Sequence, residues 1–114
     1  MKNAKIPHMP EHAWQDRVTG LCDWYRLLWY HVHDSRKDRA GFPDLVIVGP
    51  GGIAFAELKS TSGKVSAAQE EWYLGLRRAG GRAYIWRPED WPEVQNVLKE
   101  LSVRQGASHA GTGQ

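Results

Sequence analysis

The chain has 114 residues, of which 41% are hydrophobic and 25% charged, and its formal net charge at pH 7 is +2. This length and composition fit one soluble domain and leave no room for a second one. The single cysteine, Cys22, excludes an internal disulfide and a zinc site made of several cysteines. The sequence shows neither a membrane-spanning apolar run nor the apolar core of a secretion signal. We therefore expect a cytoplasmic protein.

The first predicted helix begins near Pro10 and runs to about Trp29. Apolar side chains recur along it at helical spacing: Trp14, Val18, Leu21, Cys22, Tyr25, Leu28 and Trp29. Glu11 stands three residues before Trp14, which places its carboxylate at the inward edge of the helix start. A carboxylate buried there needs a partner. The simpler alternative is an acidic residue favoured by the helix macrodipole.

A basic connection over residues 34–43 follows, and a further lysine lies in a later loop. The polar and basic side chains that we expect to contact phosphates are Ser35, Arg36, Lys37, Arg39 and Lys64. Such contacts give sequence-independent, salt-sensitive binding to nucleic acid. The alternative is a solvated charged loop, because two aspartates in the same connection partly cancel its positive charge.

Residues 44–48 and 53–59 are predicted to form two strands joined by the turn at residues 49–52. The midpoint between Asp44 and Glu57 falls between Pro50 and Gly51. A symmetric hairpin therefore makes the two carboxylates cross-strand partners, with Cβ atoms roughly 4.5–5.5 Å apart. Strand alternation places Lys59 on the same face as Glu57. Two opposed carboxylates repel each other, so this cluster calls for a divalent cation.

Two carboxylates, a backbone carbonyl such as that of Leu58, and waters suit Mg²⁺ or Mn²⁺. Such an ion would polarise a phosphodiester and lower the pKa of a bound water, while Lys59 would orient that water or stabilise developing charge. The alternative is that Asp44 caps a loop and that Glu57 and Lys59 form an exposed ion pair.

The second helix is predicted to open at Ser66 and to end at residues 80–81. Its expected inward face consists of Ala68, Trp72, Leu76 and Ala79. Gln69 fits a capping box with Ser66. A strand over residues 82–86 and a last helix follow, whose apolar positions are Trp91, Val94, Val97, Leu98 and Leu101. The predicted order is α-β-β-β-α-β-α, with one domain over residues 1–101 and a mobile tail over residues 102–114.

Six tryptophans in so short a chain suggest aromatic platforms for base stacking. We interpret most of them as core residues instead, because several fall on apolar helix faces or in a strand. Only Trp91, at the start of the last helix, is expected to be exposed.

The pair Pro43-Asp44, followed by Glu57-Leu58-Lys59, resembles the PD-(D/E)XK nuclease signature. With residues 30–36, 41–45, 69, 72 and 84–88, it is similar to the compact stand-alone VRR-NUC nucleases of phages and bacteria, over roughly residues 11–98. The resemblance implies a restriction-endonuclease-like α/β fold with a mixed central sheet flanked by helices. It also implies a Mg²⁺- or Mn²⁺-dependent DNA nuclease in replication, recombination or repair, with relatives that act on flapped or branched DNA.

The same resemblance makes Glu11 a third acidic metal ligand and Gln69 a residue that lines the active site. It further implies a bacterial cell or a phage-infected host, and a homodimer in the manner of Holliday-junction resolvases. Endonuclease and exonuclease action stay open. The competing hypothesis is a non-catalytic DNA-binding or recruitment module that keeps the nuclease fold.

Overall fold

The computed structural model describes residues 9–32 and 40–104. Its elements are α1 (Glu11–Trp24), β1 (Leu28–His31), β2 (Leu45–Gly49), β3 (Gly52–Leu58), α2 (Ala67–Arg78), β4 (Arg82–Trp86), the 3₁₀ turn η1 (Pro88–Asp90) and α3 (Trp91–Leu101). This order confirms the predicted α-β-β-β-α-β-α arrangement, with η1 leading into the last helix.

The four strands form one mixed sheet in the order β1-β2-β3-β4. The pairs β1–β2 and β2–β3 are antiparallel, and β3–β4 is parallel because α2 carries the chain back between them. Gly49 pairs with Gly52, so Pro50 and Gly51 form the two-residue turn on which the predicted symmetry of the hairpin depends. The sheet therefore has the mixed character of a restriction-endonuclease-like core.

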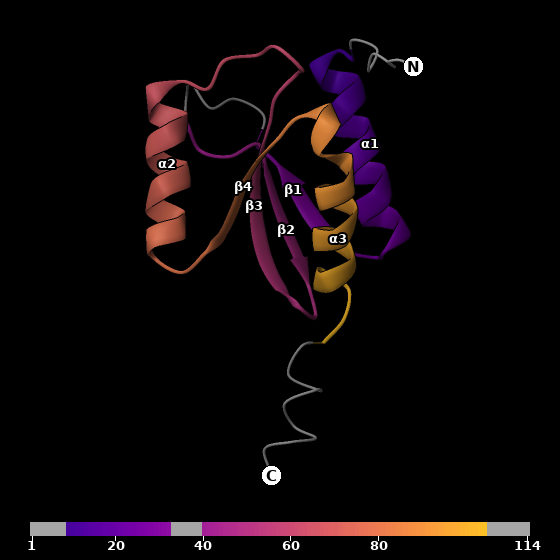
Figure 1. The fold of residues 1–114 in the computed structure, drawn as a ribbon. Coiled ribbons are helices and arrows are strands. Elements are labelled where there is room, and N and C mark those ends of the chain that lie inside the picture. The colour runs from indigo at the N-terminus through magenta and orange to yellow at the C-terminus, as the bar shows by residue number, and fades with distance from the viewer. Residues whose placement is uncertain (1–8, 33–39, 105–114) are drawn as a thin grey trace.

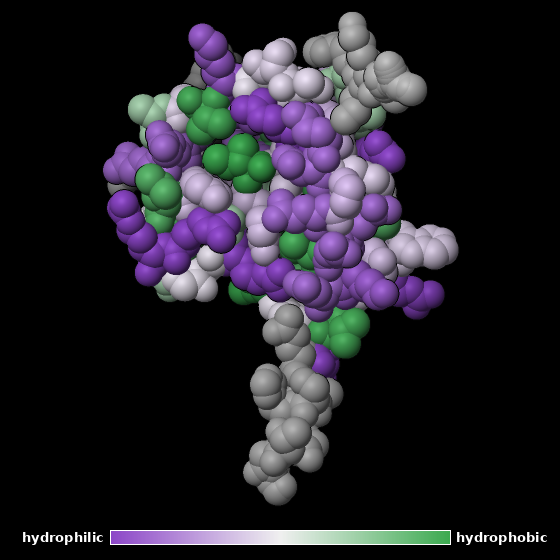
Figure 2. All heavy atoms as spheres, viewed as in Figure 1, coloured by the Kyte–Doolittle hydropathy of each residue, from purple (hydrophilic) through white to green (hydrophobic). Residues whose placement is uncertain are grey.

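One face of the sheet is covered by α1 and α3, which lie side by side (Figure 1). Alternate strand residues point into this layer and are fully buried: Leu45, Ile47, Ala54, Ala56, Leu58 and Trp86. The helices contribute Trp14, Val18, Cys22, Val94, Leu98 and Leu101. Burial of each large apolar side chain stabilises the fold by about 1.5–3 kcal/mol. In Figure 2, hydrophilic side chains dominate the outer surface of α3, as expected for an amphipathic helix.

The first helix is shorter than predicted, because it ends at Trp24 rather than near Trp29. Arg26 adopts a left-handed backbone conformation with φ of 60°, and the N–H of Leu27 donates to the carbonyl of Cys22. The chain then enters β1, where Trp29 pairs with Ile47. The apolar spacing at these positions suits either a helix or a strand, and the sequence alone did not locate the reversal.

The second helix also differs from the prediction, because none of its residues is buried. The side chains expected to face inward line an open groove of about 610 Å³, whose lining is Ala40, Ala68, Glu71, Trp72, Gly75, Leu76 and Ala79. Phe42 lies between α2 and the sheet. The centroid of its ring is 5.0 Å from that of Trp72 and 6.3 Å from that of Phe55. Hence Phe42 connects α2 to the second face of the sheet, which α2 covers only in part.

The interpretation of most tryptophans as core residues is wrong. Only Trp14 and Trp86 are fully buried, whereas Trp24 is 77% exposed at the end of α1 and Trp29 is 39% exposed on the edge strand. Trp72 and Trp91 are half-buried, so Trp91 is less exposed than expected.

The chain continues beyond α3 with a short turn, in which the N–H of Val103 donates to the carbonyl of Glu100. The predicted mobile tail lies for the most part, over residues 105–114, outside the described residues. Among the described residues, none of the helices has the length and apolar character needed to cross a membrane.

Candidate active site

Asp44 directly precedes β2 and lies opposite Glu57. The β2–β3 register pairs Leu45 with Ala56, and one further step along both strands brings Asp44 against Glu57, as the hairpin symmetry predicts. The backbone of Asp44 accepts from the N–H of Val32 at 2.9 Å, and its Oδ2 accepts from the N–H of Leu58 at 2.9 Å. One carboxylate oxygen of Asp44 thus anchors its side chain to the end of β3.

Glu57 is 5% exposed, which rules out the alternative of an exposed ion pair. Its Oε2 accepts a 2.8 Å hydrogen bond from Gln69 and lies 3.7 Å from Lys59 Nζ. Its Oε1 is buried and has no hydrogen-bond partner among the described residues. An unpartnered buried carboxylate oxygen is costly, so this atom requires a proton or a cation.

The electrostatics of Glu57 agree with this arrangement. Burial, and after it the negative charge of Asp44, raises the pKa of Glu57 to about 8, while Lys59 opposes the shift. Glu11 adds a smaller contribution in the same direction as Asp44. When Glu57 is ionised, the site holds more negative charge than Lys59 neutralises, so a cation that takes the place of the proton on Glu57 would be bound favourably.

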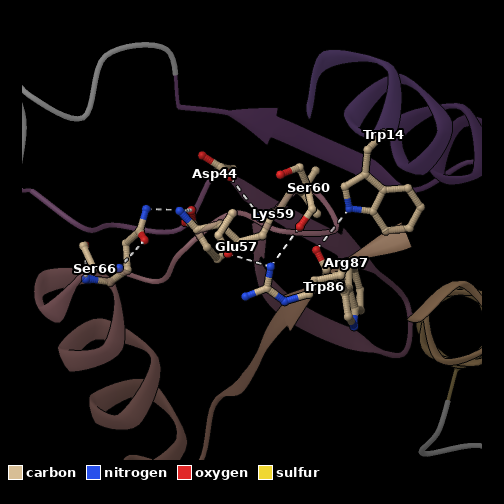
Figure 3. A network of polar contacts seen from close by, with 11 residues as sticks. Trp14, Asp44, Glu57, Lys59, Ser60, Ser66, Trp86 and Arg87 are labelled. Carbon is tan, nitrogen blue, oxygen red and sulfur yellow. Dashed lines mark hydrogen bonds and ion pairs between the residues drawn. The ribbon is translucent and has the colours of Figure 1, made fainter. Parts of the chain in front are cut away.

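Lys59 follows the last residue of β3 and is fixed through its backbone (Figure 3). Its N–H donates to the carbonyl of Trp86 at 2.9 Å, and Trp14 Nε1 donates to the same oxygen at 3.0 Å. One carbonyl thus ties the end of β3 to β4 and to α1. The Lys59 side chain is 13% exposed, and its ammonium group lies beside Glu57.

Gln69 makes the helix-cap contacts that the sequence predicts and also contacts Glu57. Its N–H donates to Ser66 Oγ at 3.1 Å and its Oε1 accepts from the Ser66 N–H at 2.9 Å, which completes the capping box at the start of α2. Its Nε2 donates to Glu57. Gln69 consequently caps α2 and binds the Glu57 carboxylate at once.

The donor set fits a hard divalent cation. Asp44 and Glu57 supply carboxylate oxygens, and the buried Oε1 of Glu57 is the atom that a cation would satisfy. In an extended strand the N–H and C=O of one residue point toward the same neighbouring strand. The N–H of Leu58 donates to Asp44, so the Leu58 carbonyl also faces Asp44. Glu11 lies in the first turn of α1 and is exposed. Over residues 9–32 and 40–104, no three His, Cys, Asp or Glu side chains are grouped closely enough to hold an ion.

Of the predicted phosphate contacts, Lys64 is exposed in the loop between β3 and α2, just beyond Lys59. The others, Ser35, Arg36, Lys37 and Arg39, lie outside the described residues.

Two residues that shape the site had no role in the sequence analysis. Phe42, two residues before Asp44, packs on Trp72 of α2 and on Phe55 of β3. Arg87 donates to two carbonyl oxygens in the loop after Lys59. The arginine stands before a proline after a strand, and no periodic or charge signal in the sequence identifies its acceptors.

Comparison with known proteins agrees with the geometry. The sequence model of the VRR-NUC domain matches residues 6–89. A solved structure described as a VRR_NUC domain protein superposes with a TM-score of 0.56 at 21% identity, covering 83% of this chain and 89% of that one. The search of curated proteins gave no significant match.

Proposed function

Because this chain belongs to the VRR-NUC domain family, a nuclease family with the PD-(D/E)XK arrangement, we propose that it hydrolyses DNA phosphodiester bonds with the help of Mg²⁺ or Mn²⁺. The observation that carries this proposal is the buried carboxylate of Glu57, opposite Asp44, with Oε1 unpartnered. Structural ion pairs do not need such an atom, whereas a cation site does.

Asp44 and Glu57 would hold the cation, with the Leu58 carbonyl as a further ligand. Glu11 is not grouped with the two carboxylates in this structure, so it would become a third acidic ligand only after the start of α1 moves toward them. When bound, the cation would polarise the scissile phosphate and lower the pKa of an attacking water. The closeness of Glu11 to the site is supported by its effect on the pKa of Glu57.

The other residues of the site act on charge and orientation. Lys59, whose Nζ lies 3.7 Å from Glu57 Oε2, would stabilise negative charge that develops on the phosphate oxygens. Gln69 holds the Glu57 carboxylate in place through its 2.8 Å hydrogen bond. Lys64 and the basic residues of the connection before Asp44 would bind the flanking phosphates.

We further propose branched or flapped DNA as the preferred substrate, endonucleolytic cleavage, a cytoplasmic location and a homodimer. The dimer is supported by exposed apolar side chains on the sheet face opposite α1 and α3. Leu28 is 72% exposed, Tyr30 64% and Ile53 50%, and strand alternation puts all three on this face. Exposed apolar clusters of this kind mark interaction surfaces.

The test is cleavage of labelled duplex, single-stranded, flap, splayed-arm and four-way-junction DNA with Mg²⁺, Mn²⁺ or EDTA. Glu57→Ala and Lys59→Ala are the site variants, and Lys99→Ala is the control because Lys99 is exposed on α3. Metal-dependent cutting that both site variants lose, and the control keeps, is expected. Metal-indifferent DNA binding without cutting would instead support a non-catalytic module, and a folded Glu57→Ala protein with parental activity would refute the site.

The proposed homodimer is tested separately, by measuring the molar mass in solution. Light scattering after size exclusion should give twice the chain mass for the parental protein and the single mass for Tyr30→Glu. A monomer in both cases would contradict it.

A further inference from the structure

The turn that follows Lys59, over residues 60–63, accepts hydrogen bonds from the side chain of Arg87. We propose that Arg87 is a positioning residue for the active-site lysine: it fixes this turn against the Lys59 side chain and so holds the ammonium group at Glu57. The inference rests on the proposed function and adds to it a residue outside the cluster of carboxylates, lysine and glutamine.

The contact between Arg87 and the turn is specific. Arg87 Nη1 donates to the carbonyl of Ser60 at 2.8 Å and to that of Gly63 at 2.6 Å (Figure 3). The turn is closed only weakly by its own backbone, because the Gly63 N–H lies 3.3 Å from the Ser60 carbonyl. One guanidinium nitrogen therefore joins the two ends of the turn, in addition to this long backbone hydrogen bond.

The backbone of Arg87 is itself held just after β4. Its N–H donates to Asp90 Oδ2 at 2.8 Å, and the N–H of Asp90 returns a 2.7 Å bond to the Arg87 carbonyl. The carbonyl of the preceding residue, Trp86, accepts a hydrogen bond from the N–H of Lys59. The last residue of β4 thus fixes the backbone of Lys59, and the residue after it fixes the turn beyond.

The turn lies beside the Lys59 side chain. A Cβ placed on Gly63 would lie 3.5 Å from Lys59 Cδ and 3.1 Å from Ser60 Oγ, so the space between Gly63 and the lysine stem has room for about one methyl group. A lysine side chain has many rotamers and loses entropy when it is held. The nearby turn on one side and the Glu57 carboxylate at the tip restrict these rotamers, which agrees with the 13% exposure of the Lys59 side chain.

An arginine suits this task because the guanidinium has only donors, arranged on a rigid plane, and both of its partners here are carbonyl oxygens. A lysine at position 87 carries its nitrogen on a flexible stem rather than on a rigid plane, and so would hold the two carbonyls less firmly. Alanine would leave both carbonyls without this donor. We therefore expect Lys59 to be displaced more by Arg87→Ala than by Arg87→Lys.

The experiment compares Arg87→Ala and Arg87→Lys with the parental chain, with Arg82→Ala as the matched control. Arg82 also makes two guanidinium hydrogen bonds, to Tyr84 and Glu100, but it does not contact the turn. Two readouts are taken on folded protein, checked by circular dichroism: kcat and KM on the best cleaved DNA, and the rate at which an amine-reactive reagent labels Lys59, read by peptide mass spectrometry. The exposed Lys99 serves as the internal reference.

For Arg87→Ala we expect kcat to fall about tenfold to a hundredfold, as a displaced catalytic group implies. KM should change less than about threefold, because the loss concerns the reacting state rather than DNA binding. Labelling of Lys59 should accelerate while that of Lys99 stays constant, Arg87→Lys should recover part of both effects, and Arg82→Ala should show neither.

The proposal is overturned if the Arg87 variants keep parental kcat and Lys59 labelling. It is also overturned if they raise KM alone, which would make Arg87 a DNA contact. Should Arg87→Ala fail to fold, Arg87→Lys decides by the same two readouts. Absence of cleavage by the parental chain would refute the proposed function, yet labelling would still decide whether Arg87 positions Lys59.

Discussion

Gln69 Nε2 donates to Glu57 Oε2 at 2.8 Å, while Oε1 of the same amide accepts from the backbone N–H of Ser66. The helix cap therefore sets the orientation of the amide: with its oxygen engaged by Ser66, its nitrogen must face the carboxylate. The start of α2 and the chemistry of Glu57 are coupled through one planar group.

Replacement of Gln69 by glutamate separates these two functions. Gln69→Glu keeps an oxygen for the Ser66 N–H but turns a second oxygen toward Glu57, and the added negative charge raises the pKa of Glu57 further. We expect α2 to stay folded and cleavage to fall about tenfold to a hundredfold, as is usual when the partner of a metal-binding group is lost. Circular dichroism and initial rates measure the two outcomes.

Ser66→Ala is the complementary variant, because it removes the cap acceptor and leaves the bond from Gln69 to Glu57. It should lower the unfolding free energy by about 1 kcal/mol and the Tm by roughly 4–8 °C. Cleavage at 25 °C should stay near the parental rate. Equal loss of activity in both variants would mean that Gln69 acts only through the helix.

The raised pKa of Glu57 predicts how stability depends on pH without metal. The folded protein holds a proton on Glu57 that the unfolded chain releases between about pH 4.5 and 8. This proton's contribution to stability is complete below pH 4.5 and is lost as the pH rises through 8. Glu57→Gln removes the titration, so we expect its Tm to exceed the parental value at pH 8 by about 5 °C or more. At pH 5 the difference should shrink.

The measurement is thermal unfolding of both proteins in EDTA from pH 5 to pH 9. Parallel pH profiles would show that Glu57 is not protonated in the folded state. The predicted pattern has a functional meaning, because a site residue that destabilises the metal-free protein is retained for its chemistry rather than for the fold.

The centre of the site could be derived from the sequence because it depends on local geometry. A two-residue turn fixes the register of the hairpin, and the register alone sets Asp44 against Glu57. The capping box likewise depends on positions three residues apart. The burial of Glu57 was not derivable, since it depends on Gln69 and on packing from elements far away in the chain.

The sequence was misleading where one apolar pattern is compatible with two different structures. The apolar positions from Tyr25 to Trp29 continue a helical stripe, yet Arg26 reverses the chain and they begin a strand instead. In α2 the apolar stripe exists, but Phe42 occupies the space toward the sheet and leaves the stripe lining a groove. Arg87 was missed because its partners are backbone carbonyls, which every sequence possesses.

Cation binding predicts a stability change that does not require any substrate. Mg²⁺ or Mn²⁺ should raise the Tm of the parental chain at pH 8, because a ligand at about one hundred times its Kd stabilises by about 2.7 kcal/mol. EDTA should reverse the shift. Asp44→Asn, which keeps the size of the side chain, should abolish most of it, and a shift unchanged in that variant would place the cation elsewhere.

Two glycines with left-handed backbones provide a matched pair for the link between the Asp44 loop and α2. Gly41 has φ of 88° and Gly80 has φ of 89°. A Cβ at Gly80 would meet open space, so Gly80→Ala should lose only about 1–2 kcal/mol from backbone strain and keep full activity.

A Cβ at Gly41 would collide with the backbone of Ala68 and come within 2.7 Å of the Gln69 nitrogen. Gly41→Ala should therefore lose about 2–5 kcal/mol, since overpacking adds to the same strain. It should also slow cleavage under conditions where it stays folded, because a displaced helix start carries Gln69 away from Glu57. Urea titrations and initial rates of the two variants test this, and equal effects at both glycines would show that the contact of Gly41 with α2 does not position the site.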